Sequence, residues 1–292
     1  MRIGKGDVMT KLLALIDGSV YSQSVVDHAA WASQRTQASV ELLHVLGRRD
    51  VSSAPADYSG NITVDSRDTL LQELAQLDAD RARLAQKRGR VILDEAKARL
   101  QAAGVAEVKT HLRNGDLVEA LQEYEKACDL VIIGKRGEAA DFAKLHLGSN
   151  LERVVRSSTK PIIVTSRAFK PVNRFLIAFD GGESAMKAVS HIAKGKLFPG
   201  MQAYLLMVGS ESSDARAKLD RAAGMLREAG YVVEAGIEPG QPEAVIAANV
   251  EAKGIDLLVM GAYGHSRIRS LIIGSTTSEM IRSCLVPVML FR

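Results

Sequence analysis

The sequence predicts an α/β fold built as two tandem, doubly wound domains, each a parallel sheet flanked by helices. Two observations predict this fold. The chain repeats itself once along its length, and in both copies short apolar segments alternate with segments of helical length. A length of 292 residues leaves room for two domains of ordinary size, and 47% hydrophobic with 25% charged residues is a globular composition.

The repeat is clearest where each copy begins. The segment LLALIDG at residues 12–18 returns as FLIAFDG at residues 175–181, so Asp17 corresponds to Asp180. Later segments match at a shorter spacing, since DLVIIG at residues 129–134 corresponds to DLLVMG at residues 256–261. The first copy therefore carries extra sequence between its second and third strands.

This insert covers residues 48–90. It opens with a stretch rich in Ser, Ala, Asp and Gly, and residues 69–100 then carry spaced Leu and Ala among charged residues. That pattern predicts one or two amphipathic helices. The copies meet at a short linker, Phe169-Lys170-Pro171, which gives predicted domains of residues 9–166 and 171–292.

Each copy contains five short apolar segments that predict strands. In the first copy they are residues 12–16, 40–45, 108–111, 130–133 and 162–165. In the second copy they are residues 175–179, 203–208, 232–235, 257–260 and 286–291. Segments of helical length, such as residues 22–35 and 117–127, lie between them. Continuous apolar strands separated by helices are typical of a parallel sheet covered on both faces.

Composition argues against several classes of function. The net charge of +4 is mild, because 38 basic residues are spread among 34 acidic ones, and few aromatic residues are available to stack on bases. No apolar stretch reaches the roughly 20 residues needed to cross a membrane. Cys128 and Cys284 form no CxxC pair, which argues against a disulfide framework or zinc site. We expect a soluble, cytoplasmic protein with no nucleic-acid or membrane partner.

The strand-end aspartates are the first candidate binding residues. Asp17-Gly18 and Asp180-Gly181 follow the first strand of each copy, at the edge where parallel sheets bind ligands. A carboxylate there can accept hydrogen bonds from ribose hydroxyls. The alternative is a turn or a helix cap, because Asp and Gly are favoured at both.

The most specific motif follows the fourth strand of the second copy. Residues 261–276 read GAYGHSRIRSLIIGST, which has the pattern G-x2-G-x9-G-S. Glycine lets the backbone approach a ligand closely, and a helix beginning after Gly274 would offer its N–H groups to a phosphate. Ser275 and Thr276 add hydroxyl donors. The alternative is an ordinary connection from strand to helix.

The first copy has a looser version of this loop. Gly134-Lys135-Arg136-Gly137 is followed by ten residues and then Gly148-Ser149-Asn150, so the spacing is one residue longer. Glu138 and Asp141 add negative charge that would repel a phosphate. Lys135 and Arg136 either offset that charge or lie in solvent. We expect weaker binding in the first copy.

These motifs resemble those of the universal stress protein family. The resemblance rests on the glycine loop, the aspartate ending the first strand, and LLHV at residues 42–45 ending the second. It covers nearly the whole chain and is that of a tandem member. It implies an adenine nucleotide alpha hydrolase-like fold, with a five-stranded parallel sheet of order 3-2-1-4-5 in each domain. It also implies that the last strands of the two domains pair edge to edge, as a pseudo-dimer.

The resemblance further implies a site for adenine nucleotide in each domain. In the second, Asp180 would contact the ribose and the backbone of Val208 the adenine, while Met260 would line the base pocket. The phosphates would be held by Gly261, Gly264, Gly274, Ser275 and Thr276. The matching residues of the first domain are Asp17, Val45, Ile133, Gly134, Gly137, Gly148, Ser149 and Asn150. We expect ATP, alone or with Mg²⁺, mainly in the second domain.

Other polar residues give weaker signals. His265 and Arg267 lie inside the glycine loop, where they could contact a γ-phosphate. His28 and His191 repeat between the copies at positions where packing is commoner than catalysis. The chain contains no GxxxxGK[ST] motif and no recognisable catalytic triad or metal-ligand cluster. We therefore expect no catalytic residues, and at most weak ATPase activity.

The leading hypothesis is a stress-response or regulatory protein that binds ATP without turning it over, or hydrolyses it slowly. One alternative is a nucleotide-free scaffold in which the insert binds a protein partner or covers a small-molecule or lipid-like ligand. Another is a genuine ATPase or adenylyl-transfer enzyme. Association into a homodimer is a further expectation. Fold analogy alone does not decide among these alternatives.

Overall fold

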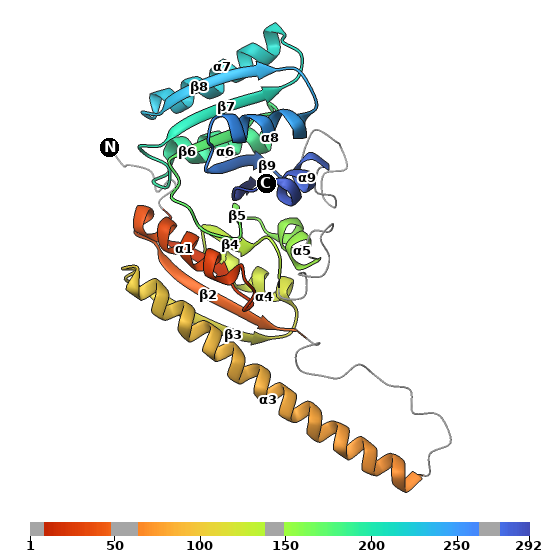
Figure 1. Ribbon diagram of the computed structural model, residues 1–292. Helices are drawn as coiled ribbons and strands as arrows, with labels where there is room; N and C mark the ends of the chain where they lie inside the picture. The colour runs from red at the N-terminus through yellow and green to blue at the C-terminus, as the bar shows by residue number, and fades with distance from the viewer. Residues whose placement is uncertain (1–8, 48–63, 138–148, 263–274) are drawn as a thin grey trace.

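The structure is a computed structural model that describes residues 9–47, 64–137, 149–262 and 275–292 (Figure 1). Its first half contains five strands: β1 (Lys11–Leu15), β2 (Ser39–Leu46), β3 (Val108–Asn114), β4 (Leu130–Gly134) and β5 (Ile162–Thr165). Its helices are α1 (Ser22–Thr36), α3 (Val64–Ala102), α4 (Leu117–Tyr124), the 3₁₀ turn η1 (Glu125–Ala127) and α5 (Ser149–Ser157). Strands and helices alternate as predicted.

The second half repeats this order. Its strands are β6 (Arg174–Ala178), β7 (Gln202–Val208), β8 (Val232–Glu238), β9 (Leu257–Gly261) and β10 (Val288–Phe291). Its helices are α6 (Glu183–Lys194), α7 (Ser213–Glu228), α8 (Pro242–Ala252) and α9 (Ser275–Ser283). No helix in the described ranges has both the length and the apolar composition needed to cross a membrane.

All ten strands join in one sheet, in the order β3-β2-β1-β4-β5-β10-β9-β6-β7-β8. Each half thus has the strand order 3-2-1-4-5 that the resemblance implied, with parallel pairing inside the half. The halves meet through β5 and β10, which pair antiparallel with Ile163 opposite Met289. The predicted edge-to-edge pairing is confirmed, and it removes two unprotected sheet edges.

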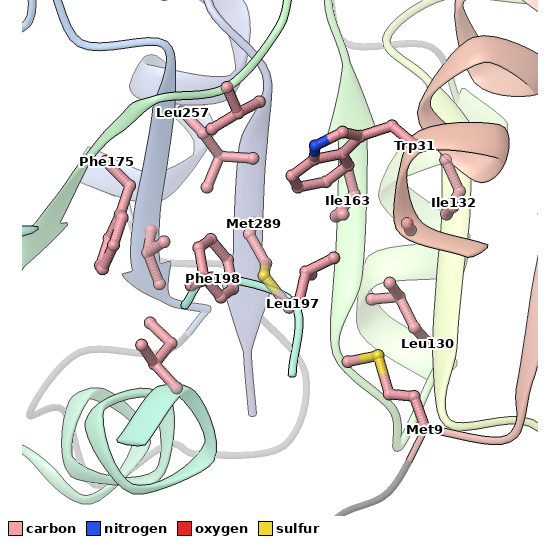
Figure 2. Packing of buried hydrophobic residues seen from close by; sticks show 14 of the residues in the cluster. Met9, Trp31, Leu130, Ile132, Ile163, Phe175, Leu197, Phe198, Leu257 and Met289 are labelled. Carbon is pink, nitrogen blue, oxygen red and sulfur yellow. The ribbon is translucent and has the colours of Figure 1, made fainter. Parts of the chain in front are cut away.

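Helices cover both faces of the sheet and enclose two apolar cores. The first core lies under α1, α3, α6 and α7, and the second under α4, α5, α8 and α9. Each core continues across the joint between the halves. In the first core, Trp31 of α1 lies beside Ile163 of β5, with Met289 of β10 and Leu197 next to them (Figure 2). Burial of one such side chain stabilises the folded protein by about 1.5–3 kcal/mol.

The insert of the first copy forms a single helix where it is described. α3 runs without a break over 39 residues, so the choice between one and two helices is settled in favour of one. Its C-terminal part packs Leu93, Ala96 and Leu100 in the first core. The shorter α7 takes the equivalent place in the second half. Its N-terminal part extends beyond the sheet (Figure 1). Residues 48–63 of the insert lie outside the described residues.

Some predicted boundaries were wrong by a few residues. β3 and β8 each run three residues further than predicted, because they pair along the full length of β2 and β7, up to Leu46 with Asn114 and Val208 with Glu238. The predicted helix over residues 117–127 ends at Tyr124 and continues as the η1 turn. β10 begins at Val288 rather than at residue 286.

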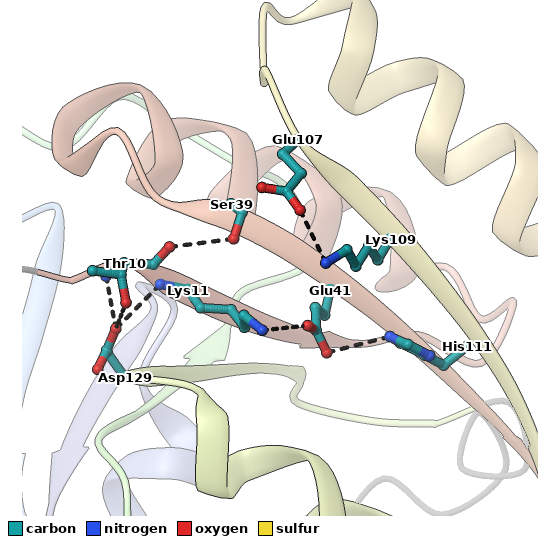
Figure 3. A network of polar contacts seen from close by, with 8 residues as sticks. All are labelled: Thr10, Lys11, Ser39, Glu41, Glu107, Lys109, His111 and Asp129. Atoms are coloured by element: carbon teal, nitrogen blue, oxygen red, sulfur yellow. Dashed lines mark hydrogen bonds and ion pairs between the residues drawn. The ribbon is translucent and has the colours of Figure 1, made fainter.

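Polar contacts fix the starts of the strands in each half, shown for the first half in Figure 3. Asp129 accepts hydrogen bonds from the backbone N–H groups of Thr10 and Lys11, at 2.7 and 3.1 Å. Asp256 repeats this contact with the start of β6 in the second half. Glu41, which is buried, forms an ion pair with Lys11 at 2.8 Å, and its Oε2 lies 3.2 Å from Nε2 of His111. These contacts hold β1, β2 and β3 in register.

Candidate functional site

The candidate site of each half lies at the carboxyl ends of two neighbouring strands. The helices that follow these two strands lie on opposite faces of the sheet. In the second half these strands are β6 and β9, which pair in parallel up to Ala178 with Met260. α6 follows β6 on the face of the first core, and α9 follows β9 on the face of the second. Doubly wound sheets bind ligands at this point, where strand order reverses.

Asp180 is the exposed carboxylate of the site in the second half. It follows β6, and its Oδ1 accepts a hydrogen bond from the N–H of Gly182 at 2.8 Å. Gly181 between them has φ +73°, a left-handed conformation that glycine adopts without strain. This turn starts α6 at Glu183 and leaves Asp180 at the surface, in reach of a ligand's hydroxyl groups.

Gly261 ends β9 directly beside the first turn of α6. A Cβ atom at this position would lie 3.0 Å from the Cβ of Ser184, so only glycine fits without displacing the helix. Met260, which precedes it, is buried in the second core. Val208 ends β7 and is half-buried, two strands away from β9. The structure therefore brings Asp180 and Gly261 together at the ends of adjacent strands.

Helix α9 begins at Ser275, as the glycine motif predicted, and Ser275 is exposed. The Thr277 hydroxyl donates to the carbonyl of Gly261 at 3.1 Å and ties the first turn of α9 to the end of β9. The Thr276 hydroxyl donates to Oε1 of Glu243 in α8 at 2.7 Å, and this bond lowers the pKa of Glu243. Glu243 is a partner of Thr276 that the sequence motif did not reveal.

Several predicted residues lie outside the described part of the chain. In the second half these are Gly264, His265, Arg267 and Gly274. In the first half these are Gly148, Glu138 and Asp141. Their contribution to the site remains a prediction.

In the first half, Asp17 is more enclosed than Asp180. It is half-buried, and its Oδ1 accepts hydrogen bonds from the N–H of Ser19 at 3.0 Å and the hydroxyl of Ser22 at 3.2 Å. A Cβ atom on Gly137 would lie 2.7 Å from its Oδ2, so the glycine loop rests against the carboxylate. Asp17 thus stabilises its own turn and the adjoining loop.

Two bulky side chains also surround the first site. Gly134 matches Gly261, but a Cβ atom there would meet the Cβ of Tyr21 at 2.7 Å, where the second half has Ser184. Ile92 of α3 covers the turn after β1, since its Cδ1 would lie 2.7 Å from a Cβ on Gly18. The exchange of Ser184 for Tyr21 was visible in the repeat, whereas the contact of α3 was not.

Lys135 reaches the other half of the molecule. Its Nζ donates a hydrogen bond to the carbonyl of Cys284 at 2.9 Å, just past the end of α9 in the other half. Burial lowers the pKa of this amino group. Lys135 is therefore partly buried rather than solvated, and the sequence did not reveal its contact with Cys284 because the two residues are far apart in the chain.

The remaining predicted residues of the first half sit at matching positions. Val45 is half-buried near the end of β2, and Ile133 is buried in β4. α5 begins at Ser149, and Asn150 in its first turn is exposed. The framework of the site is therefore the same in both halves, and the difference lies in what surrounds the aspartate and the glycines.

The repeated histidines pack at the joint between the halves. His28 is buried, its Nδ1 donates to the carbonyl of Ser24 at 2.7 Å, and its ring lies 4.9 Å from that of Phe169. Burial lowers the pKa of His28 to about 4. The ring of His191 lies 5.2 Å from that of Phe291. The prediction that these imidazoles pack is confirmed.

Comparison with known proteins agrees with this architecture. The model of the universal stress protein family matches residues 9–166 and 171–292. Universal stress protein Slr1230 of Synechocystis is 36% identical over 287 residues, covering 97% of this chain and 100% of that protein. A universal stress protein of Mycolicibacterium smegmatis is 23% identical over 301 residues, with 96% of each chain covered.

Among solved structures, a universal stress protein from Archaeoglobus fulgidus superposes with a TM-score of 0.70 at 22% identity, covering 97% of this chain and 96% of that one. A functionally unknown protein, PA1789 of Pseudomonas aeruginosa, superposes with a TM-score of 0.59 at 16% identity, covering 98% and 93%. These likenesses concern the fold. The family match and the Synechocystis relative go further, and the chain belongs to the universal stress protein family, whose unit it carries twice in tandem.

Proposed function

We propose that this universal stress protein binds one ATP per chain, in its second domain at residues 171–292. The observation that carries the proposal is the meeting of three features at one end of two adjacent strands. These are the exposed carboxylate of Asp180, the glycine Gly261 and the exposed start of α9 at Ser275. A carboxylate can accept hydrogen bonds from the ribose hydroxyls of a nucleotide, and a helix N-terminus can bind its phosphates.

The residues present fit the parts of ATP in order. Asp180 would accept hydrogen bonds from the ribose, and the backbone at the half-buried Val208 would contact the adenine. Met260 would pack below the base. The phosphates would lie near Gly261 and Ser275, together with Gly264, His265, Arg267 and Gly274 of the connecting loop. Mg²⁺ would offset the phosphate charge, which matters because the Glu243 carboxylate lies beside Thr276.

We propose that the first domain binds nucleotide weakly. Asp17 is half-buried and already accepts two hydrogen bonds from its own turn. Tyr21 occupies the place of Ser184, and Lys135 is directed to the other half of the molecule. A nucleotide would have to displace these contacts, which costs free energy.

Nucleotide occupancy would act through the stability of the fold rather than through turnover. A ligand that binds only the folded state stabilises it by about 2.7 kcal/mol when its concentration is about 100 times the dissociation constant. ATP bound in the second domain would contact the ends of β6 and β9 and the start of α9, and would so hold these elements together. We therefore propose a stress-response role in which bound ATP sets the stability of this domain and is hydrolysed slowly, if at all.

Calorimetric titration with ATP tests this proposal. We expect one ATP per wild-type chain, no binding to Gly274→Asp, and unchanged binding to the matched variant Gly148→Asp. The introduced carboxylate repels phosphates only where they bind. No binding to the wild-type protein would contradict the whole proposal. Two ATP per chain, or loss of binding in Gly148→Asp, would contradict the unequal use of the two domains.

A further inference from the structure

Among the residues that the structure describes, the N-terminal part of α3 contributes no side chain to either apolar core. From Leu70 to Arg88 no side chain is buried, whereas Gly89, Leu93 and Ala96 further along are. This part of the helix extends away from the sheet (Figure 1). A helix without tertiary packing is only marginally stable in water, because most helical stability in proteins comes from burial of an apolar face.

The projecting part nevertheless carries an apolar stripe. Leu70, Leu74, Leu77, Leu84 and Val91 recur at spacings of four, three, seven and seven residues, which is the repeat of a two-stranded coiled coil. The exposed fractions of Leu77, Leu84 and Val91 are 46%, 67% and 49%. Arg81 and Arg88 fill the two remaining positions of the repeat.

The stripe and the packed face of α3 point in different directions. At the angular spacing of a regular helix, the stripe lies about a third of a turn from the side that Leu93, Ala96 and Leu100 bury against the sheet. A partner helix could therefore lie along the stripe up to Leu84, beyond which Arg88 approaches the turn after β1, its Nη2 3.9 Å from the place of a Cβ on Gly18. The pattern is that of a surface on which a second helix packs.

Charges between residues 68 and 90 of this helix are separated by sign. Between residues 68 and 80 all ionisable side chains are acidic: Asp68, Glu73, Asp78 and Asp80. Between residues 81 and 90 all are basic: Arg81, Arg83, Lys87, Arg88 and Arg90. The structure records an ion pair between the two segments, Asp80 with Arg83 at 3.3 Å, and both side chains are exposed. Such a surface pair contributes little to stability.

We propose that α3 pairs with α3 of a second copy of this chain, as an antiparallel two-stranded coiled coil. In an antiparallel pair the acidic segment of one helix faces the basic segment of the other, twice over. In a parallel pair acidic faces acidic and basic faces basic, which is repulsive. The same two-fold axis relates both ends of the stripe: where Leu74 faces Leu84 of the second copy, Leu77 faces Arg81 and Leu70 faces Arg88.

The mass of the full-length protein in solution tests the pairing. Sedimentation equilibrium should give twice the chain mass of 31.5 kDa. The double variant Leu77→Asp/Leu84→Asp should raise the dissociation constant at least about 100-fold, because four buried Leu side chains are lost per dimer. The matched control Leu285→Asp, at a leucine that is 90% exposed after α9, should leave the mass unchanged.

Cysteine cross-linking tests the direction of the two helices. Leu74→Cys and Leu84→Cys chains, mixed and oxidised, should form a mixed disulfide, because these positions face each other in the antiparallel pair. Leu70→Cys alone should not cross-link to itself, since its two copies would lie at opposite ends. The native Cys128 and Cys284 are buried, so the wild-type chain serves as the background.

Three results would overturn the proposal. A monomeric wild-type protein would leave α3 without a second copy. A dimer that survives Leu77→Asp/Leu84→Asp would use another surface. Self-cross-linking of Leu70→Cys would indicate a parallel pair. None of these outcomes depends on ATP, so the pairing and the proposed function fail independently.

Discussion

Asp17 and Asp180 occupy matching positions in the repeat but differ in what they contact. Asp180 is exposed at the end of β6, whereas Asp17 accepts hydrogen bonds from Ser19 and Ser22 and touches the glycine loop. We expect Asp180→Ala to weaken ATP binding at least about 10-fold, the effect of losing hydrogen bonds to a charged acceptor. Asp17→Ala should change it less than about twofold and should lower stability instead.

Titration of both variants with ATP, together with urea unfolding, measures these effects. If Asp17→Ala weakened binding as much as Asp180→Ala, the first domain would share the site equally.

His28 makes the stability of the protein depend on pH. Its pKa is about 4 in the folded state against an ordinary value of 6.5, because burial disfavours the charged ring. A base whose pKa is depressed by folding contributes fully above the unfolded pKa, and that stability is lost as pH falls below 6.5 towards 4. We expect His28 to account for a loss of about 2 kcal/mol between pH 7.5 and pH 5.

Urea unfolding of wild type and His28→Gln at both pH values isolates this contribution. The wild-type free energy of unfolding should fall by about 2 kcal/mol more than that of the variant. Equal pH dependence in the two proteins would show that His28 is not responsible.

Single residues could be predicted where a spacing defined them. The strand-end aspartates and Gly261 were found from the repeat and the glycine motif, and the structure places Asp180 and Gly261 at the ends of adjacent strands. The roles of Lys135 and Glu243 could not be found, because each contacts a residue from a different element, far away in sequence. Such contacts depend on how elements pack, which no local pattern records.

Helix α9 links the candidate site to the other half of the molecule. Its first turn is tied to Gly261 by Thr277, and Lys135 binds the Cys284 carbonyl just past its last turn. A cation there satisfies a free carbonyl group and interacts favourably with the helix dipole. We expect Lys135→Met to lower the free energy of unfolding by about 1 kcal/mol.

Chemical unfolding measures this loss, with Lys170→Met in the exposed linker as the matched control. The control should stay within about 0.5 kcal/mol of wild type. Equal effects of the two substitutions would mean that the contact with Cys284 does not stabilise α9.

Strands and helices were predictable because apolar runs and helical spacings are local. α3 illustrates the limit. Gly89 lies inside α3, where a glycine normally weakens a helix. In the structure a Cβ at Gly89 would lie 2.7 Å from Leu112 and 2.9 Å from His44, so glycine lets α3 pack closely on β2 and β3. This packing keeps the helix continuous.

The whole molecule is held together by the joint of β5 and β10 and by cores shared between the halves. Met289 is fully buried at this joint, opposite Ile163. We expect the chain to unfold in one cooperative transition, and Met289→Ala to destabilise it by about 2–5 kcal/mol as a buried cavity does. The exposed Leu285→Ala should change stability little.

Differential scanning calorimetry checks both parts of this prediction. Two separate transitions, of which Met289→Ala moves only one, would show that the halves unfold independently.

For the whole molecule, the duplication predicted two related halves, and the family resemblance implied the strand order and the antiparallel pairing of the last strands. The continuous ten-stranded sheet follows from that joint. The unequal surroundings of the two sites could be foreseen in part, from the longer loop of the first copy. The contribution of α3, whose Ile92 covers the turn at Gly18, required the three-dimensional packing.

The nucleotide content of the purified protein tests the central proposal most directly. The full chain is purified without added nucleotide and denatured, and the released small molecules are identified and counted by mass spectrometry. We predict ATP at close to one per wild-type chain, retained in Asp17→Ala and lost in Asp180→Ala. Release of no adenine nucleotide, together with no binding on titration, would contradict the proposed function.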